Sequence, residues 1–285
     1  RIKDKAVGER LQSTVDSEFA TQQTYPDQSM VFMPDIPAQS PLANSPIEII
    51  RDDFHGRSFR AAIFDFDGTL SLLRRNWQDV MIPMMVDILV ATGSGERRDE
   101  LGELVEEFVM QLNGRQTIYQ MIQLADEVRQ RGRTPLDPLD YKQQYHDLLW
   151  RQIGQRVEAV RKGKVAAETM TVPGSHQLLT RLCNLGVRLY LASGTDLTYV
   201  ADEVTVLGLD QFFETRIYGA LDDYKQFSKA LVIQHMIAEA GFSPDQIVGF
   251  GDGFVEIEEI KRVGGTAVGV ASDETTRAGG DVWKR

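Results

Sequence analysis

The 285-residue sequence contains only one cysteine, Cys183. A single cysteine excludes an internal disulfide framework and a cysteine-rich zinc site, and it predicts a reducing compartment, the cytoplasm. Because no run of about 18 apolar residues occurs, we expect no membrane-spanning helix and no membrane partner. The first residues lack the apolar segment of a signal peptide. Because the sequence begins with Arg1 rather than Met, this observation carries little weight for targeting.

Basic residues are also scarce, since 31 Lys and Arg stand against 42 Asp and Glu and give a net charge of −11. Nucleic-acid binding depends on Lys and Arg contacts to phosphates, so this balance argues against a general nucleic-acid partner. It does not exclude a small phosphorylated molecule, because a bound divalent cation supplies positive charge locally. We expect most carboxylates to lie on solvated helix faces and a few to form a site.

The N-terminal part of the sequence is rich in proline. Residues 26–46 hold five of the ten prolines, mixed with Ser, Gln and Asp. This composition predicts an extended linker or arm rather than a packed element, and we assign residues 1–58 to such an extension. Apolar residues within it, such as Met30 and Phe32, leave open whether parts of it dock on a surface.

The pattern changes at Phe59, where a short apolar run predicts a buried strand over 59–66. A helical block follows, with helices expected at 79–92, 98–112, 116–131 and 140–162. After Pro173 strands and helices alternate, with strands expected at 187–192, 215–218, 246–250 and 266–270. This alternation predicts an α/β fold with a parallel sheet covered on both faces and a helical insertion after its first strand.

Acidic side chains follow two of the predicted strands. Asp65 and Asp67 come directly after the first strand, and Asp252 and Glu256 follow the strand at 246–250. Ligands of open parallel sheets bind beyond the carboxyl ends of the strands, so we expect these acids to share one cleft. Carboxylates so close repel one another unless a cation or a proton relieves them. With no His or Cys cluster to compete, four acids predict a Mg²⁺ site.

Hydroxyl and amine groups complete the predicted site. Ser193 and Gly194 follow the middle strand and are expected to open a helix, which suits them to bind phosphate oxygens. Either Lys229 or Lys225 is placed to neutralise phosphate charge.

Four segments together resemble the haloacid dehalogenase superfamily. The segment Asp65-Phe66-Asp67-Gly68-Thr69-Leu70 resembles the first signature motif, and Ser193 resembles the second. Lys229 resembles the third motif, and the segment 251–256 resembles the fourth, with Glu256 where many members carry Asp. The order and spacing match from about residue 59 to 270, whereas residues 1–58 lie outside the resemblance.

The resemblance implies a Rossmann-like core of residues 59–76 and 171–285, with residues 77–170 inserted as a mobile α-helical cap domain. A long helical block in this position is similar to the cap of phosphoglycolate phosphatase-like and β-phosphoglucomutase-like members. The implied function is Mg²⁺-dependent hydrolysis of a small phosphorylated metabolite. A sugar phosphomutase, or a non-catalytic regulatory domain of a longer polypeptide, is the alternative. The sequence does not set the substrate or the oligomeric state.

The resemblance also implies a role for each residue of the motifs. Asp65 is the nucleophile that forms an aspartyl-phosphate, and Asp67 is the general acid and then the general base. The metal ligands are Asp65, the Asp67 carbonyl and Asp252, while Glu256 holds a metal-bound water or orients the lysine. The phosphoryl oxygens are bound by Ser193, Gly194 and Lys229.

Other interpretations of individual residues stay open. Arg74 and Arg75 either reach a substrate anion or are solvated charges at the entry to the helical block. Ser193 is also a reasonable helix N-cap, and Glu256 a reasonable exposed helix residue. We expect Cys183 to be a small buried hydrophobe.

Overall fold

The computed structural model describes residues 47, 49–50, 56–221, 223–224 and 228–271. The chain divides into two compact units, residues 1–52 and 53–285, and the fold is that of the second. Most of the predicted extension at 1–58, and Lys225, lie outside the described residues.

The centre of the fold is a five-stranded sheet. Its strands are β1 (Ala61–Phe64), β2 (Arg188–Asp196), β3 (Ile217–Ala220), β4 (Ile247–Gly251) and β5 (Thr266–Gly269). They lie in the order β3-β2-β1-β4-β5, and every neighbouring pair is parallel. Because all strands are parallel, their carboxyl ends meet at one edge of the sheet. The predicted α/β, Rossmann-like architecture is confirmed.

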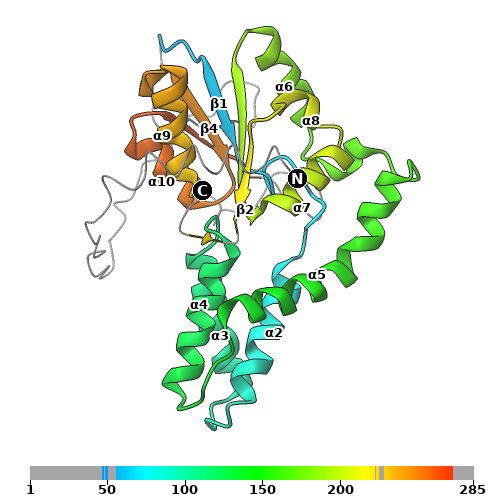
Figure 1. Ribbon diagram of the computed structural model, residues 1–285, viewed down its shortest axis with the longest axis vertical. Coiled ribbons are helices and arrows are strands. Elements are labelled where there is room, and N and C mark those ends of the chain that lie inside the picture. Colours follow the sequence, from blue (N-terminus) through cyan, green and yellow to red (C-terminus); the bar gives the residue numbers. More distant parts are fainter. Residues whose placement is uncertain (1–46, 48, 51–55, 222, 225–227, 272–285) are drawn as a thin grey trace. The chain divides into compact units, whose positions relative to one another are not determined.

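Helices cover both faces of this sheet (Figure 1). One face carries α6 (Ser175–Asn184), α7 (Leu197–Val206) and α8 (Asp210–Phe213), and the other carries α9 (Lys229–Ala240) and α10 (Phe254–Arg262). Side chains alternate along β1, so Ala62 and Phe64 face the first layer while Ala61 and Ile63 face the second. All four are at most 6% exposed, which explains the continuous apolar run at this strand.

In chain order, four helices follow β1 and precede β2, and they pack on one another (Figure 1). They are α2 (Gln78–Val90), α3 (Arg98–Gln111), α4 (Thr117–Gln130) and α5 (Pro138–Arg161). Helix α5 buries Tyr141, Tyr145, Leu149 and Ile153, which recur every fourth residue and form one apolar stripe. Pro138 at its first position and the Asp137 side chain, which accepts from the Leu139 N–H at 2.9 Å, mark its start.

The structure differs from the sequence prediction at several positions. Strand β2 runs on to Asp196, because pairing with β3 extends to Asp196 and Ala220. Three short elements were not predicted, namely α8 and the 3₁₀ turns η1 (Ala167–Met170) and η3 (Pro244–Gln246). The prediction of a buried Cys183 was wrong, because this side of α6 faces solvent.

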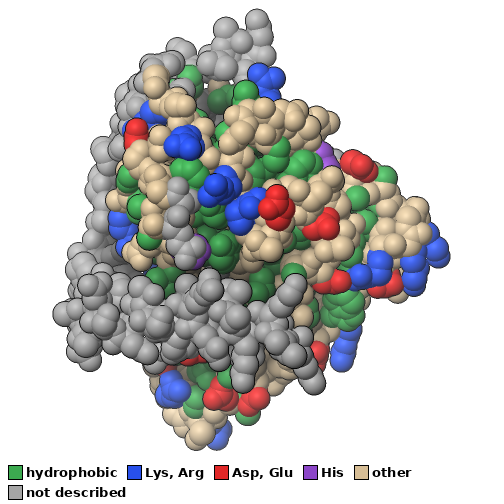
Figure 2. Space-filling view, turned by 45° about the horizontal axis from the view of Figure 1, so that its top comes forward, with side chains coloured by type: hydrophobic (Ala, Val, Ile, Leu, Met, Phe, Trp, Pro, Cys, Tyr) green, Lys and Arg blue, Asp and Glu red, His purple; other side chains and the backbone are tan. Residues whose placement is uncertain are grey.

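Charged side chains of both signs are interspersed on the visible surface in Figure 2, where Asp and Glu form no single continuous patch among the coloured residues. Most of the described Asp and Glu residues are exposed, among them Asp87, Glu103 and Glu106 on helices, as expected for solvated helix faces. In the part of the chain that the structure describes, no helix has the length and apolarity needed to cross a membrane.

A buried histidine on α5 predicts how stability depends on pH. His146 is 8% exposed and stacks on Tyr199 with the ring centroids 4.8 Å apart. Burial, followed by the charges of Arg74 and Lys142, lowers the pKa of His146 from 6.5 to about 3. Between these values the unfolded chain binds the proton and the folded chain does not, so His146 lowers the free energy of unfolding as pH falls below 6.5.

When the pH is lowered from about 7.5 to about 5, the free energy of unfolding of wild type should fall by about 1 to 2 kcal/mol more than that of His146→Phe, which has no imidazole to protonate. Urea unfolding at both pH values measures this difference. His176→Phe is the control, because His176 lies half-buried on α6 away from α5. Equal acid sensitivity of His146→Phe and wild type would contradict the assignment.

Candidate active site

The first motif lies in a tight turn at the carboxyl end of β1. Asp65 follows the last residue of the strand, and its N–H donates to the Phe250 carbonyl at 2.9 Å. The chain then turns around the Phe66 carbonyl, which accepts from the three N–H groups of residues 69–71. Gly68 adopts a φ of +77°, which a side chain would disfavour. The turn brings Asp65 and Asp67 to the lining of one cavity.

Lys229 joins two acidic residues at this edge. It is the first residue of α9 and is 8% exposed, and its Nζ lies 2.7 Å from Asp65 Oδ1 and also contacts Glu256 Oε1. Burial alone would lower the pKa of Lys229, but Asp65 and Glu256 outweigh it and hold the pKa above its usual value. Burial raises the pKa of Asp65 to about 7; Lys229 opposes this rise, while Glu256 and Asp252 add to it.

Asp67 is held on one side by the end of β2. Thr195 Oγ1 donates to Asp67 Oδ2 at 2.9 Å. The other oxygen, Oδ1, is buried and has no hydrogen-bond partner among the described residues. Burial raises the pKa of Asp67 to about 7, against the lowering effect of Arg74, and Glu203 and Asp65 raise it further.

The second motif lies inside a strand rather than at a helix start. Helix α7 begins at Leu197 with Asp196 as its N-cap, so the prediction that Ser193 and Gly194 open the helix was wrong. Ser193 is 1% exposed, and its Oγ accepts from the Thr195 N–H at 3.1 Å. The extension of β2 brings Ser193 and Gly194 to the same edge as Asp65.

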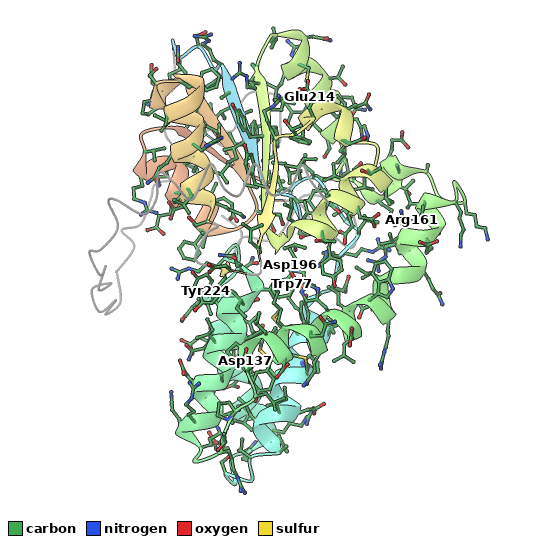
Figure 3. All side chains as sticks on the ribbon, in the orientation of Figure 1. Trp77, Asp137, Arg161, Asp196, Glu214 and Tyr224 are labelled. Atoms are coloured by element: carbon green, nitrogen blue, oxygen red, sulfur yellow. The ribbon has the colours of Figure 1, made fainter. Side chains whose placement is uncertain are left out.

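A cavity of about 70 Å³ brings the core and the helical insertion together. The core contributes Asp65, Asp67, Ser193, Gly194, Thr195, Lys229 and Asp252. The insertion and the segment leading to it contribute Arg74, Trp77, Met81, Asn113, Gly114, Arg115, Thr117, Gln120 and Tyr145. In Figure 3, Trp77 and Asp196 lie where the helices meet the strand ends, and Asp196 accepts from Lys142 of α5 at 2.5 Å.

Of the predicted residues Glu256, Arg74 and Arg75, only Arg74 lines this cavity. Glu256 is outside the lining of this cavity and is 6% exposed, so the alternative of an exposed helix residue was wrong. Arg75 is also outside the lining, whereas Arg74 reaches it. Arg74 is 7% exposed, and its Nε and Nη2 donate to Glu203, so it is not a solvated charge.

The site's donors suit a Mg²⁺ ion held by few protein ligands. Among the described residues, no group of three or more His, Cys, Asp or Glu is placed to hold a metal, so a four-carboxylate cage is not present there. Mg²⁺ needs only one or two carboxylates, because water and substrate phosphate complete its shell. Asp65, Asp252 and the Asp67 carbonyl are oxygen donors of this kind. Besides burial, the charges of Glu256 and Asp252 raise the pKa of Asp65, so a cation at this edge would relieve repulsion among these acids.

The match to a family model covers residues 59–264, with the description haloacid dehalogenase-like hydrolase. The chain belongs to this family. Membership confirms the resemblance in the sequence and makes this haloacid dehalogenase-like protein an enzyme of the hydrolase class. Among curated proteins, none matches it.

Solved structures share the fold of this hydrolase. A β-phosphoglucomutase from Clostridium difficile gives a TM-score of 0.51 at 13% identity and covers 77% of this chain and 88% of its own. A family IA, variant 3 hydrolase from Entamoeba histolytica gives 0.50 at 17%, covering 75% and 84%. A predicted phosphoglycolate phosphatase from Haemophilus somnus gives 0.49 at 18%, covering 74% and 84%. At these identities the likeness to the first two structures concerns the fold alone, and the third, whose TM-score is below 0.5, adds nothing to it.

Gly194 lets a loop of the helical insertion reach the strand ends. A Cβ at Gly194 would lie 2.4 Å from the Arg115 carbonyl oxygen, and one at Gly114 would lie 2.6 Å from a Glu256 carboxylate oxygen. Since the first contact is with backbone, Gly194→Ala must push the loop away. We expect kcat/KM to fall by about tenfold or more, because small displacements of positioning groups have large effects on rate.

Gly102→Ala is the control for this substitution, because Gly102 lies within α3 and a Cβ there meets nothing within 4 Å. It should keep the wild-type kcat/KM and raise the free energy of unfolding by about 0.5 to 1 kcal/mol. Full activity of Gly194→Ala would show that the loop does not need this approach during turnover.

Proposed function

We propose that this hydrolase is a Mg²⁺-dependent phosphatase that acts on a small phosphorylated metabolite through an aspartyl-phosphate. The observation that carries the proposal is that Asp65, Asp67, Ser193 and Lys229 line one cavity at the carboxyl ends of β1 and β2 and the start of α9. A carboxylate nucleophile, a second carboxyl for proton transfer and donors for phosphoryl oxygens are thereby within reach of one phosphate ester.

In the first proposed step, a carboxylate oxygen of Asp65 attacks phosphorus and the bond between phosphorus and the ester oxygen breaks. Asp67 Oδ1, which has no hydrogen-bond partner among the described residues, carries the proton that passes to the leaving oxygen. Lys229 and Ser193 bind the phosphoryl oxygens where charge develops. Asp65, Asp252 and the Asp67 carbonyl would hold Mg²⁺, whose positive charge would stabilise the phosphoryl group.

In the second step, the Asp67 carboxylate takes a proton from a water molecule as the water oxygen attacks phosphorus. The bond between phosphorus and the Asp65 oxygen breaks, inorganic phosphate leaves, and both carboxyl groups return to their starting states. Splitting hydrolysis in this way replaces one difficult step by two easier ones.

We propose the helical insertion, residues 77–170, as a cap over the core formed by 59–76 and 171–285. Its support is that Asn113, Gly114 and Arg115 of the insertion line the cavity beside core residues. Such a cap excludes bulk water from the reacting groups. Because such a cap encloses the reacting groups, the arrangement favours a small substrate over a phosphorylated protein.

The test is release of inorganic phosphate from a panel of small phosphate esters, with Mg²⁺ and with a chelator. The expected result is release from at least one ester that stops when the chelator removes the cation. Release from no ester would overturn the proposal, and undiminished release with the chelator would remove the metal from it. Conversion of a sugar phosphate to its isomer without phosphate release would favour a phosphomutase instead.

A further inference from the structure

A buried ion pair lies directly behind the proposed general acid. Arg74 donates from Nε to the Glu203 carboxylate at 3.0 and 3.1 Å and from Nη2 at 2.7 Å. Arg74 is 7% exposed and Glu203, on α7, is 1% exposed. Replacing a charged pair this deeply buried with well-packed apolar residues of similar size is often neutral or stabilising, so fold stability alone does not account for the pair.

The arginine of this pair stands beside Asp67 without bonding to it. Arg74 Nε is 4.0 Å from Asp67 Oδ1, which is too long for a hydrogen bond. A guanidinium next to a carboxylate normally forms a two-pronged hydrogen bond with it. Here the guanidinium already makes that bond with Glu203. As a result, Asp67 Oδ1 has a positive neighbour but no donor among the residues that the structure describes, while Oδ2 accepts from Thr195.

We propose that Glu203 and Arg74 form a positioning pair for proton transfer by Asp67. Arg74 fixes the orientation of the Asp67 carboxyl by its charge. Glu203 accepts the hydrogen bonds of Arg74 Nε and Nη2, so these donors do not bind Asp67 Oδ1. The oxygen that must carry the proton to the leaving group thus stays open. This inference rests on the proposed function, in which Asp67 is the general acid.

If the pair acts through Asp67, its loss should slow an ester whose leaving group needs a proton more than an ester whose leaving group needs none. The phenolate of p-nitrophenyl phosphate leaves without a proton, whereas the alkoxide of an alkyl phosphate needs one from Asp67. The measurement is kcat/KM for both esters, since this constant reports formation of the aspartyl-phosphate. Their ratio does not depend on the fraction of protein that is folded and active.

Two variants test the pair. Arg74→Met combined with Glu203→Leu replaces both charges with apolar side chains and should fold. We expect its kcat/KM to fall about tenfold more for the alkyl ester than for p-nitrophenyl phosphate. Glu203→Gln alone weakens the acceptor of Arg74, so that Arg74 can hydrogen-bond Asp67 Oδ1. Its kcat/KM should therefore fall about 100-fold more for the alkyl ester than for p-nitrophenyl phosphate, which is within the usual contribution of a general acid.

The matched control is Asp202→Asn, which breaks the exposed pair of Asp202 with Arg161 one residue before Glu203. Its ratio should equal that of wild type. If wild type is active and both test variants lower kcat/KM equally for the two esters, or leave it unchanged, the positioning role is wrong. If wild type hydrolyses neither ester nor any of the panel, it is the proposed function that fails.

Discussion

Asp65→Asn is expected to abolish phosphate release, with kcat at least about four orders of magnitude below wild type, which corresponds to about 5 kcal/mol in the barrier. The amide keeps the shape of the carboxylate but cannot attack phosphorus. Burial raises the pKa of Asp65 to about 7, so the folded chain disfavours the charged carboxylate at neutral pH. Without added cation, the variant's free energy of unfolding should therefore be no lower than that of wild type.

A loss of kcat without a loss of stability would show that the substitution removes a reacting group rather than unfolding the protein. Steady-state phosphate release gives kcat, and urea unfolding gives the free energy of unfolding. Asp245→Asn makes the same change at an exposed position in η3 and should leave both quantities unchanged. Activity of Asp65→Asn within tenfold of wild type would remove Asp65 as the nucleophile.

The proposed aspartyl-phosphate intermediate has a chemical signature of its own. Borohydride reduces an acyl phosphate to an alcohol and releases phosphate, so wild type quenched during turnover should carry homoserine at position 65. The mass of the peptide that contains Asp65 measures this change. An unmodified peptide under conditions of rapid turnover would indicate direct attack by water, with Asp65 in another role.

Much of the fold follows from short-range patterns in the sequence. The continuous apolar run before Asp65 predicts a strand buried on both faces, and β1 is buried on both. Because parallel strands end at one edge, the positions of Asp65 and Asp252 at that edge follow from the two predicted strands that they directly follow. The end of β2 does not follow in this way, because pairing with β3 rather than local propensity carries it to Asp196.

The site is less predictable where its contacts depend on distant packing. Glu203 is an acid on an amphipathic helix, and nothing local distinguishes it from its exposed neighbour Asp202. Its pairing with Arg74 spans 129 residues and exists only once α7 packs beside the segment after β1. The residues of the helical insertion that line the cavity, such as Tyr145, also carry no motif, because they face the site through tertiary packing.

Lys229→Met is expected to lower kcat/KM by about 10² to 10³, because it removes the proposed donor to the phosphoryl oxygens. It should also lower the free energy of unfolding by about 3 kcal/mol, since Asp65 and Glu256 are left buried without their cation. Phosphate release and urea unfolding measure the two effects. The loss of activity should persist where the variant is fully folded, in the absence of denaturant.

Lys261→Met is the control, because Lys261 lies exposed in the last turn of α10. It should change kcat/KM less than twofold and the free energy of unfolding by at most about 0.5 kcal/mol. A destabilised Lys229→Met that keeps kcat/KM within tenfold of wild type would make Lys229 a structural counter-ion for two acids. The same loss of both quantities in Lys229→Met, beside an unaffected control, would give one ammonium group two roles, because Asp65, one of the two carboxylates that it neutralises, is also the proposed nucleophile.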